Sequence, residues 1–344
     1  MGLPVANALL GKLGLGSPKL IFGVDFTKSN EWTGKYSSAK QSLHAVGGTP
    51  NPYCTTISII GRTFAFLDKD NLIPCFGFGN ATTEDKGVFS FHTDCSPCQG
   101  YEGALICYNS IVPHVVLAGP TSYAPVVDAA ISVVEKSGGR FHVLVIITDG
   151  QVTRSVDASD EELSPQEKET INAIVNASLY PLSILVVGVG DGPWEGMNKF
   201  IDKIPARRFN NYEFVNFTDI MSKESTPSKK EIAFALAALK GIPNQKNTAS
   251  ELGLLGCVTG KAKMIYPRPP TVPYTNCPAF SVAESSSRST ATPDERNWLC
   301  PICWSKCKDM AFGCGHMTCK ECDPELIRCP ICRKPIDSRV RVYP

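Results

Sequence analysis

The sequence lacks the long apolar runs that membrane-spanning helices need. No stretch approaches the ~18 apolar residues of such a helix. An excess of one charge is also lacking, since 34 Lys and Arg stand against 33 Asp and Glu, leaving +1 over 344 residues. With this balance the whole chain has no strong positive potential that would attract nucleic acid or anionic lipid. A largely disordered chain is excluded as well, because 43% of the residues are hydrophobic and can fill a core.

The N-terminus lacks the features of a secretory signal peptide, since no basic residue precedes Lys12. Gly2 is the residue that myristoylation uses, but Ala6 stands where that signal prefers Ser or Thr. We expect residues 1–18 to form a short helix before the first strand. We also expect the protein inside the cell: in the cytoplasm, in the nucleus, or as a peripheral protein at the inner face of the plasma membrane.

Cysteine is abundant but unevenly spread. Of fifteen cysteines, eight lie between Cys300 and Cys332, whereas seven are scattered over the first 277 residues. A disulfide scaffold would distribute them through a short chain, so the cluster indicates metal binding. Seven of the clustered cysteines and one histidine follow the pattern C-x2-C-x10-C-x-H-x2-C-x2-C-x6-C-x2-C, enough for two tetrahedral Zn²⁺ sites. So small a segment needs metal to fold.

Apolar runs alternate with helical patterns over residues 19–242. The runs are rich in β-branched side chains without polar alternation, which is typical of parallel strands buried on both faces. They lie at residues 20–24, 143–147 and 184–189. A helix over about 164–179 begins at a capping box, and helical spacing over 126–134 stops at Gly138. The sequence therefore predicts an α/β fold with a doubly wound, mostly parallel sheet.

The alternation of apolar runs and helical patterns ends after residue 242. Residues 266–293 hold six prolines and nine Ser or Thr but few large apolar side chains. Such a stretch buries too little surface to offset its ordering entropy. We predict a linker over residues 243–296, a zinc module over 297–335 and a tail over 336–344. The apolar patch at 252–255 is the exception that could dock on the first domain.

The cysteine pattern resembles a C3HC4 RING finger. The resemblance implies a cross-brace, in which alternate ligand pairs share one ion. The first Zn²⁺ would be held by Cys300, Cys303, Cys319 and Cys322. The second would be held by Cys314, His316, Cys329 and Cys332.

Other residues of this module match functional positions of RING ubiquitin ligases. The resemblance implies that Ile302, Leu326 and Pro330 form the groove that docks a ubiquitin-conjugating enzyme. Arg333 follows the last zinc ligand, where many such ligases carry a linchpin arginine that bridges the enzyme and ubiquitin; a solvated surface charge is the alternative. Residues 296–344 contain nine Lys or Arg and five Asp or Glu. With seven thiolates and two Zn²⁺ added, the net charge of this segment is about +1, which is too small for a protein that binds nucleic acid.

A second candidate metal site lies in the α/β region. The first strand ends in a D-x-T-x-S run, where alternate side chains can converge on one ion. Two further segments contribute to it: Thr121 supplies a hydroxyl before the helix expected at 126–134, and Asp149 supplies a carboxylate after the strand expected at 143–147. The candidate ligands are Asp25, Thr27, Ser29, Thr121 and Asp149. This all-oxygen set suits a hard cation such as Mg²⁺, or Mn²⁺. The alternatives are that Asp25 is an ordinary acid at the end of a strand and that Asp149 lies in an ordinary turn.

These segments resemble the metal-ion-dependent adhesion site of a von Willebrand factor A domain. The resemblance implies that Thr27, Ser29 and Thr121 bind the ion directly, and that Asp25 and Asp149 bind it through water. It also implies an open coordination position that an acidic side chain of a partner fills.

Longer stretches extend the resemblance to copine-type A domains. They are residues 25–34, 51–53, 60–62, 71–74, 76–79, 149–152 and 187–194. Joined to a RING finger, such a domain is similar to the plant ubiquitin ligases of the RGLG type. This implies transfer of ubiquitin to substrate lysines from a charged conjugating enzyme, without a nucleophile on this chain, and with the A domain recruiting protein substrates. The competing hypothesis is a non-catalytic adaptor whose zinc module only docks or dimerises.

The loop motif His92-Thr-Asp-Cys95-Ser-Pro-Cys98 suggests a third metal site or a redox thiol pair. Redox C-x-x-C pairs open a helix, whereas this one follows a strand-like segment. We therefore expect ordinary loop cysteines. We expect His44, His114 and His142 to be packing or surface residues, because they have no companions at metal-binding spacing.

Overall fold

The computed structural model divides into two compact units, Met1–Pro273 and Tyr274–Pro344. In the first unit it describes residues 17–37, 42–65, 67–68, 70–154, 162–192 and 194–270. In the second it describes 309–313, 316–320, 326, 328–329 and 335–341. The helix expected within residues 1–18 lies almost wholly outside these ranges. Among the described helices, none is both long and apolar enough to cross a membrane.

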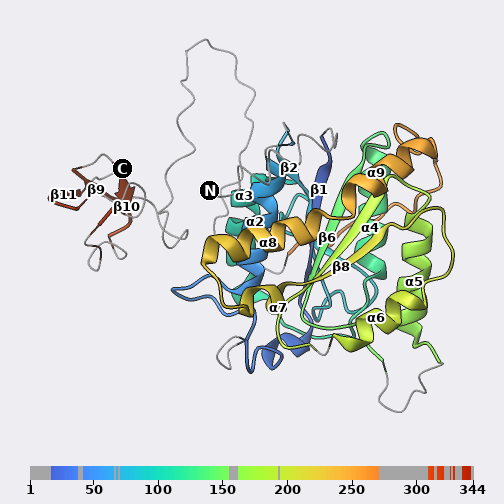
Figure 1. Cartoon of the computed structure of the whole chain (residues 1–344), viewed down its shortest axis with the longest axis horizontal. Helices are drawn as coiled ribbons and strands as arrows, with labels where there is room; N and C mark the ends of the chain where they lie inside the picture. The colour runs from blue at the N-terminus through green and yellow to red at the C-terminus, as the bar shows by residue number, and fades with distance from the viewer. Residues whose placement is uncertain are drawn as a thin grey trace, which may run out of the picture. The chain divides into compact units, whose positions relative to one another are not determined.

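A six-stranded sheet forms the centre of the first unit (Figure 1). Its order is β4-β3-β1-β6-β7-β8, and all neighbours are parallel except β3 and β4. The strands are β1 (Lys19–Asp25), β3 (Cys75–Phe78), β4 (Phe89–Ser90), β6 (His142–Thr148), β7 (Leu182–Gly188) and β8 (Tyr212–Asn216). A separate antiparallel pair joins β2 (Leu72–Ile73) to β5 (Cys98–Gln99). The prediction of a doubly wound, mostly parallel sheet is confirmed.

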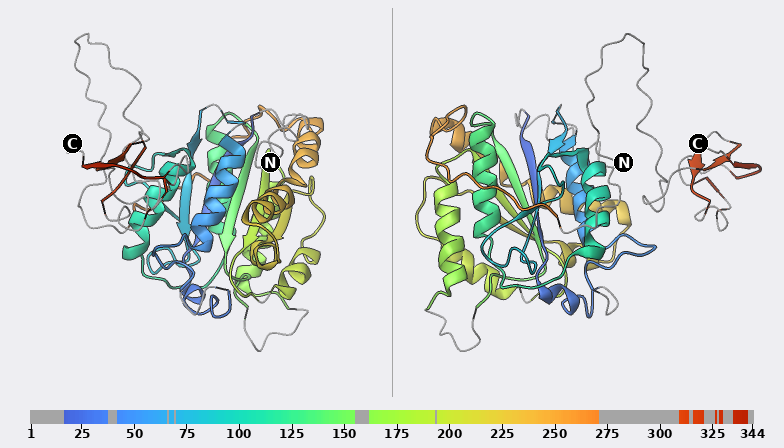
Figure 2. Two further views of the ribbon diagram at one scale, coloured as in Figure 1. Left: turned by 60° about the vertical axis from the view of Figure 1, so that its left-hand side comes forward. Right: turned by 180° about the vertical axis from the view of Figure 1, so that it is seen from behind.

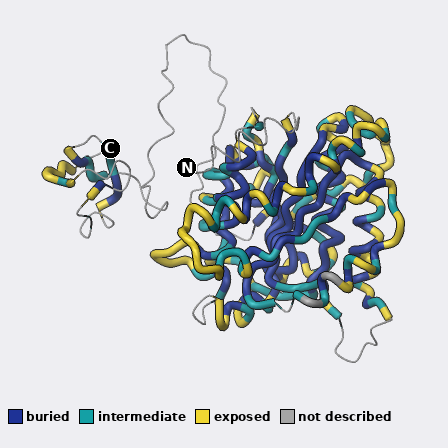
Figure 3. Tube along the Cα trace, viewed as in Figure 1, coloured by how far each residue is buried: buried dark blue, intermediate teal, exposed yellow. Residues whose placement is uncertain are grey.

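Helices cover both faces of this sheet, as the two views of Figure 2 show. One face carries α2 (Pro52–Ala65), α3 (Gly100–Ile111), α8 (Pro227–Leu239) and α9 (Ile242–Glu251). The other carries α4 (Ala124–Lys136), α5 (Pro165–Ala177) and α6 (Glu195–Asp202). In β1, Phe22 and Val24 pack in the first core and Ile21 in the second, because successive side chains point to opposite faces. Strands β3, β6 and β7 are buried along their whole length, and β1 is buried beyond its first residue (Figure 3).

Helix α5 begins as the sequence predicts. Ser164 Oγ accepts a hydrogen bond from the Glu167 amide over 3.0 Å, and Glu167 Oε2 accepts one from the Ser164 amide over 2.7 Å. Pro165 occupies the first helical position, where its missing N–H costs nothing. Helix α4 ends at Lys136, and Gly138 and Gly139 then adopt φ values of 78° and 72°, the left-handed conformation that glycine tolerates.

The expected start of the linker at residue 243 is wrong. Residues Ile242–Glu251 form α9, and the patch at 252–255 packs against the first core as anticipated. Beyond it, the Gly256 amide donates to the Gly139 carbonyl over 2.8 Å, and Arg268 pairs with Phe89 of β4. The folded domain therefore extends at least to residue 270. Backbone hydrogen bonds fix this segment, and a search for apolar patterns cannot detect them.

The second unit contains a three-stranded antiparallel sheet in the order β10-β9-β11. The strands are β9 (Met310–Phe312), β10 (Met317–Thr318) and β11 (Arg339–Arg341). The predicted tail over 336–344 therefore contributes a strand to this sheet. Phe312, Cys319 and Cys329 are buried, which gives the unit only a small apolar core among its described residues.

Candidate functional site

The carboxyl ends of β1 and β6 meet where the winding of the chain reverses direction. Strand β1 ends at Asp25, and Asp149 directly follows the last residue of β6. Both carboxylates are fully buried. Ligand sites of doubly wound sheets lie outside the carboxyl ends of the strands at this switch point. The fold therefore places both predicted acids where such a site is expected.

Four of the five predicted ligands are joined there by hydrogen bonds. The Thr27 amide donates to Asp25 Oδ1 over 2.8 Å, and the Thr27 and Ser29 hydroxyl oxygens are 3.1 Å apart. Ser29 Oγ donates to Asp149 Oδ1 over 3.0 Å. Strand alternation, the predicted cause of this convergence, holds for Asp25 and Thr27, whose backbone is extended, but not for Ser29. A 3-10 turn, η1 (Lys28–Glu31), begins after Thr27 and bends Ser29 toward Asp149.

Thr121, the fifth predicted ligand, is buried in the segment that precedes α4. Its amide donates to Thr153 Oγ1 over 2.7 Å, and its carbonyl accepts from the Thr153 amide over 3.0 Å. These bonds tie the Thr121 segment to the loop that follows Asp149. Within the described part of the chain, no hydrogen bond joins the Thr121 hydroxyl to the other four residues.

Two threonines outside the predicted ligand set, Thr33 and Thr148, complete the network. Thr148 Oγ1 donates to Asp25 Oδ2 over 2.5 Å, and Thr33 Oγ1 donates to Asp149 Oδ2 over 2.5 Å. Thr33 also lies 3.0 Å from the Ser29 carbonyl, the contact of a hydroxyl with the residue four positions earlier. The four-residue spacing between Ser29 and Thr33 is the sequence signal that could have identified Thr33.

His44 is a packing residue that supports the site by contacting the backbone of Asp25. Its ring is buried and stacks between Phe26 and Tyr53, with ring centroids 4.7 and 4.1 Å away. Its Nε2 lies 2.8 Å from the Asp25 carbonyl oxygen and its Nδ1 lies 2.7 Å from the Tyr108 hydroxyl. Burial lowers the pKa of His44 to about 3, so this ring is neutral and fixes the backbone of Asp25 without adding a charge.

The electrostatics of the site favour a bound cation. Burial raises the pKa of the Asp25 carboxyl, although hydrogen bonds from Thr148 and Thr27 oppose the shift. Burial and then the charge of Asp25 raise the pKa of the Asp149 carboxyl. Among the described residues, neither carboxylate pairs with Lys, Arg or His within 4.0 Å. Two adjoining buried acids without a basic partner repel each other, and a divalent cation would relieve that repulsion.

The donors present fit Mg²⁺ or Mn²⁺. All are carboxylate or hydroxyl oxygens, which hard cations prefer, and neither sulfur nor imidazole enters the network. Such an ion would supply a positively charged coordination point at the edge of the sheet.

In the second unit, the structure describes His316, Cys319 and Cys329 among the predicted zinc ligands. The Phe312 amide donates to the His316 carbonyl over 2.9 Å, which places the backbone of His316 beside the end of β9. Leu326 is half-buried, and its carbonyl accepts from Arg339 Nη2 over 2.6 Å. The other predicted ligands and groove residues lie outside the described residues. They are Cys300, Cys303, Cys314, Cys322, Cys332, Ile302, Pro330 and Arg333.

Comparison with known families accounts for both units. The copine family model matches residues 42–257, and the model of the zinc finger of C3HC4 type (RING finger) matches residues 296–339. E3 ubiquitin-protein ligase RGLG4 of Arabidopsis thaliana is 58% identical over 341 residues, covering 99% of this chain and 84% of that protein. The chain belongs to the RGLG family of E3 ubiquitin-protein ligases. The ligase is also 51% identical to RGLG2 of the same plant over 356 residues, covering 97% of this chain and 76% of that one.

Other matches cover only part of the chain. Copine family protein 1 of Caenorhabditis elegans is 40% identical over 245 residues, which cover 71% of the ligase and 21% of that protein. Among solved structures, manganese-loaded Plasmodium vivax TRAP protein has 14% identity and a TM-score of 0.36, over 60% of the ligase and 70% of that chain.

Family membership confirms the prediction of ubiquitin transfer over that of a non-catalytic adaptor. The protein is a RING-type E3 ubiquitin transferase with a copine-like von Willebrand factor A domain. Its RING finger binds zinc, and it acts with a ubiquitin-conjugating enzyme on protein substrates.

Proposed function

We propose that the copine-like domain of this ligase captures its protein partners through a Mg²⁺ or Mn²⁺ ion. The proposed ligands are Thr27, Ser29 and Thr121 directly, and Asp25 and Asp149 through water. The observation that carries this proposal is the pair of buried carboxylates, linked by hydroxyl groups and without a basic partner among the described residues. An acidic side chain of the partner would complete the coordination of the ion.

Isothermal titration of Mg²⁺ into the full chain tests this proposal. Asp25→Ala should abolish the binding heat, because it removes a carboxylate around which the site is organised. The matched control is Asp219→Ala, which removes an exposed acid on α7 (Phe217–Ser222) and should leave binding unchanged. Equal binding by both variants would refute the metal site.

We further propose that Ile302, Leu326 and Pro330 contact the conjugating enzyme, and that Arg333 holds the thioester-linked ubiquitin in position. The five-donor plane of a guanidinium suits simultaneous bonds to two proteins. Positioning of this kind accelerates attack by lowering the entropic cost of the transition state. Ile302→Ala and Arg333→Ala should each slow discharge of ubiquitin from the conjugating enzyme to free lysine. Unchanged rates at unchanged zinc content would refute these roles.

For location we propose the reducing interior of the cell, including peripheral association with the inner face of the plasma membrane. The support is chemical, since the six described cysteines of the first unit form no disulfide. Subcellular fractionation checks this proposal, and recovery from a secreted fraction would contradict it.

A further inference from the structure

A second cluster of metal-binding side chains lies in the first unit, away from the carboxylates. It joins His92, in the loop after β4, with Cys98 of β5 and Cys107 of α3. The ligand atoms of these three residues all lie within 4.8 Å of one another. Cys107 Sγ is 3.3 Å from His92 Nε2. Side chains from three separate segments therefore point at one small volume.

A fourth ligand adjoins this group. The Cys98 thiol is close enough to that of Cys75 for the two to interact, and this interaction together with burial raises the pKa of Cys98. Cys75 begins β3, and its Sγ also contacts the Ile73 carbonyl oxygen at 3.4 Å. Cys75 lies outside the group of three whose ligand atoms are within 4.8 Å of one another, and its approach to them on metal binding would complete a set of three sulfurs and one nitrogen.

Regular secondary structure holds these residues in place. Strand β5 pairs with β2, where Cys98 lies opposite Ile73, two residues before Cys75. The Phe91 amide donates to the Cys75 carbonyl over 3.1 Å, which anchors the residue before His92. Cys107 lies within α3. Sites built on strands and helices keep their geometry, so the cluster is organised before any ligand arrives.

The cluster is largely shielded from solvent, and the imidazole is its most exposed member. Cys75, Cys98 and Cys107 are 2%, 1% and 6% exposed and belong to the first apolar core. His92 is half-buried and is followed by exposed loop residues. An ion could therefore enter past the imidazole and then be shielded by the core.

We propose that Cys75, His92, Cys98 and Cys107 form a structural Zn²⁺ site in the copine-like domain. Zn²⁺ takes four tetrahedral ligands, with bonds of about 2.3 Å to sulfur and about 2.0 Å to nitrogen, so adjacent ligands lie about 3.5 Å apart. The sulfur-to-nitrogen distance of 3.3 Å fits such an edge. On binding, the three thiols release their protons to solvent and the neutral imidazole keeps one. The ion would tie β3, β5 and α3 together.

The sequence motif suggested a different pair. It placed Cys95 with Cys98 as a C-x-x-C unit, but Cys95 is exposed, has a φ of 61° and directs its Sγ at the Pro267 carbonyl oxygen, 3.6 Å away. The partner of Cys98 is Cys107, which comes from the following helix. Cys95 therefore provides a matched control on the same loop.

Zinc content of the full chain, purified without a metal-binding tag, tests the site. Mass spectrometry measures the number of Zn²⁺ ions per chain in each variant. Because the RING ligands are intact in all of them, a difference between variants reports on the proposed site alone. Cys107→Ala and His92→Ala should each lose one Zn²⁺ relative to the wild type, whereas Cys95→Ala should lose none. His92→Ala is the safer variant for folding because its ring is half-exposed, and circular dichroism verifies that the helices remain.

Equal zinc in the wild type and in folded His92→Ala would overturn the proposal. A loss of one Zn²⁺ in folded Cys95→Ala would overturn it too, because that residue lies outside the cluster. Copper or iron in place of the additional zinc would overturn the assignment of the metal.

Discussion

At the scale of single residues, buried polar groups in the copine-like domain are held by partners from distant segments. Thr148 and Thr33 each donate to a buried carboxylate, and His44 connects the Asp25 backbone with Tyr108. A buried polar group without such a partner destabilises a fold by about 1–3 kcal/mol. The network therefore specifies where Asp25 and Asp149 lie before any ion binds.

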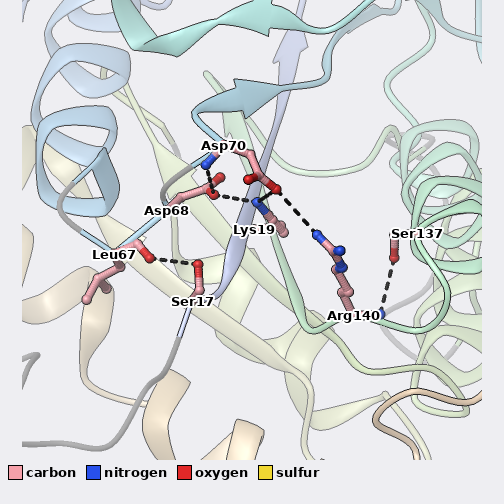
Figure 4. Close-up of polar contacts among 7 residues, drawn as sticks. All are labelled: Ser17, Lys19, Leu67, Asp68, Asp70, Ser137 and Arg140. Carbon is pink, nitrogen blue, oxygen red and sulfur yellow. Dashed lines mark hydrogen bonds and ion pairs between the residues drawn. The ribbon is translucent and has the colours of Figure 1, made fainter.

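His142 should make the domain sensitive to acid. It begins β6 beside a charged cluster in which Lys19 Nζ lies 2.5 Å from Asp68 Oδ1 and Arg140 Nη1 lies 3.4 Å from Asp70 Oδ2 (Figure 4). Burial lowers the pKa of His142 from 6.5 to about 4, and its Nδ1 contacts the Arg140 carbonyl at 2.7 Å. The unfolded chain binds this proton more readily. Stability should therefore fall as the pH drops below 6.5, by about 2 kcal/mol at pH 5.

Urea unfolding of the full chain between pH 8 and pH 5 measures this effect (~2 kcal/mol over that range). His142→Asn keeps a donor near the Arg140 carbonyl but cannot titrate, so its stability should fall less with acid. Parallel pH profiles for the two proteins would show that His142 does not contribute.

The sequence predicted the residues of the carboxylate site better than it predicted their partners. Asp25, Thr27 and Ser29 share a short motif, so their proximity could be inferred from spacing alone. The bond from Thr33 to Asp149 spans more than a hundred residues, and only the fold brings the two together. The proximity of Cys98 and Cys107 likewise depends on the fold, since α3 begins directly after β5 and turns Cys107 back toward Cys98.

At the scale of elements, the start of α5 offers a direct test of capping. Ser164→Ala removes the acceptor for the Glu167 amide and the donor to the Thr153 carbonyl. The expected loss is about 1 kcal/mol or somewhat more, which lowers the melting temperature by roughly 2–4 °C. Ser164→Asp, which keeps a capping acceptor, should recover most of that loss. Thermal unfolding followed by circular dichroism makes the comparison, and equal melting temperatures for Ser164→Ala and the wild type would contradict the capping role.

The end of α4 provides a matched pair of glycines. Gly138 and Gly139 are both left-handed, but a Cβ on Gly138 would meet open space, whereas one on Gly139 would collide with the backbone of Cys257. Both alanine variants should lose about 1 kcal/mol to backbone strain. Gly139→Ala should lose a further ~1–3 kcal/mol from overpacking, measured by urea unfolding. Equal losses would mean that the Cys257 segment does not depend on this close approach.

Elements with continuous apolar patterns were predictable, and those fixed by backbone pairing were not. The runs that became β1, β6 and β7 and the capping box of α5 could be identified from side chains alone. Strands β2 and β5 have two residues each, too few for a period to show. Helix α9 contains mostly polar residues, so its helical pattern was hidden.

At the scale of the whole molecule, the two units should carry separable tasks. Arg333→Ala should reduce the discharge of ubiquitin to free lysine at least ~10-fold, or ~1.4 kcal/mol in activation free energy, without changing Mg²⁺ affinity. Asp25→Ala should leave that discharge unchanged and reduce only the ubiquitination of a partner captured by the first unit. Paired discharge and substrate assays on the full chain measure both. Loss of discharge in folded Asp25→Ala would contradict this division, in which tethering raises the local concentration of the captured protein.

The pairing of residues near Arg268 with β4 has a consequence for solubility. The Ser90 amide donates to the Arg268 carbonyl over 2.8 Å, and the Arg268 amide donates to the Val88 carbonyl over 2.9 Å. These bonds occupy backbone groups along the outer side of the last strand of the sheet, which would otherwise attract a strand from a neighbouring molecule. A chain shortened to residue 257, where the copine match ends, would leave them open and should self-associate. The last segment of the folded domain thus shields its sheet from aggregation.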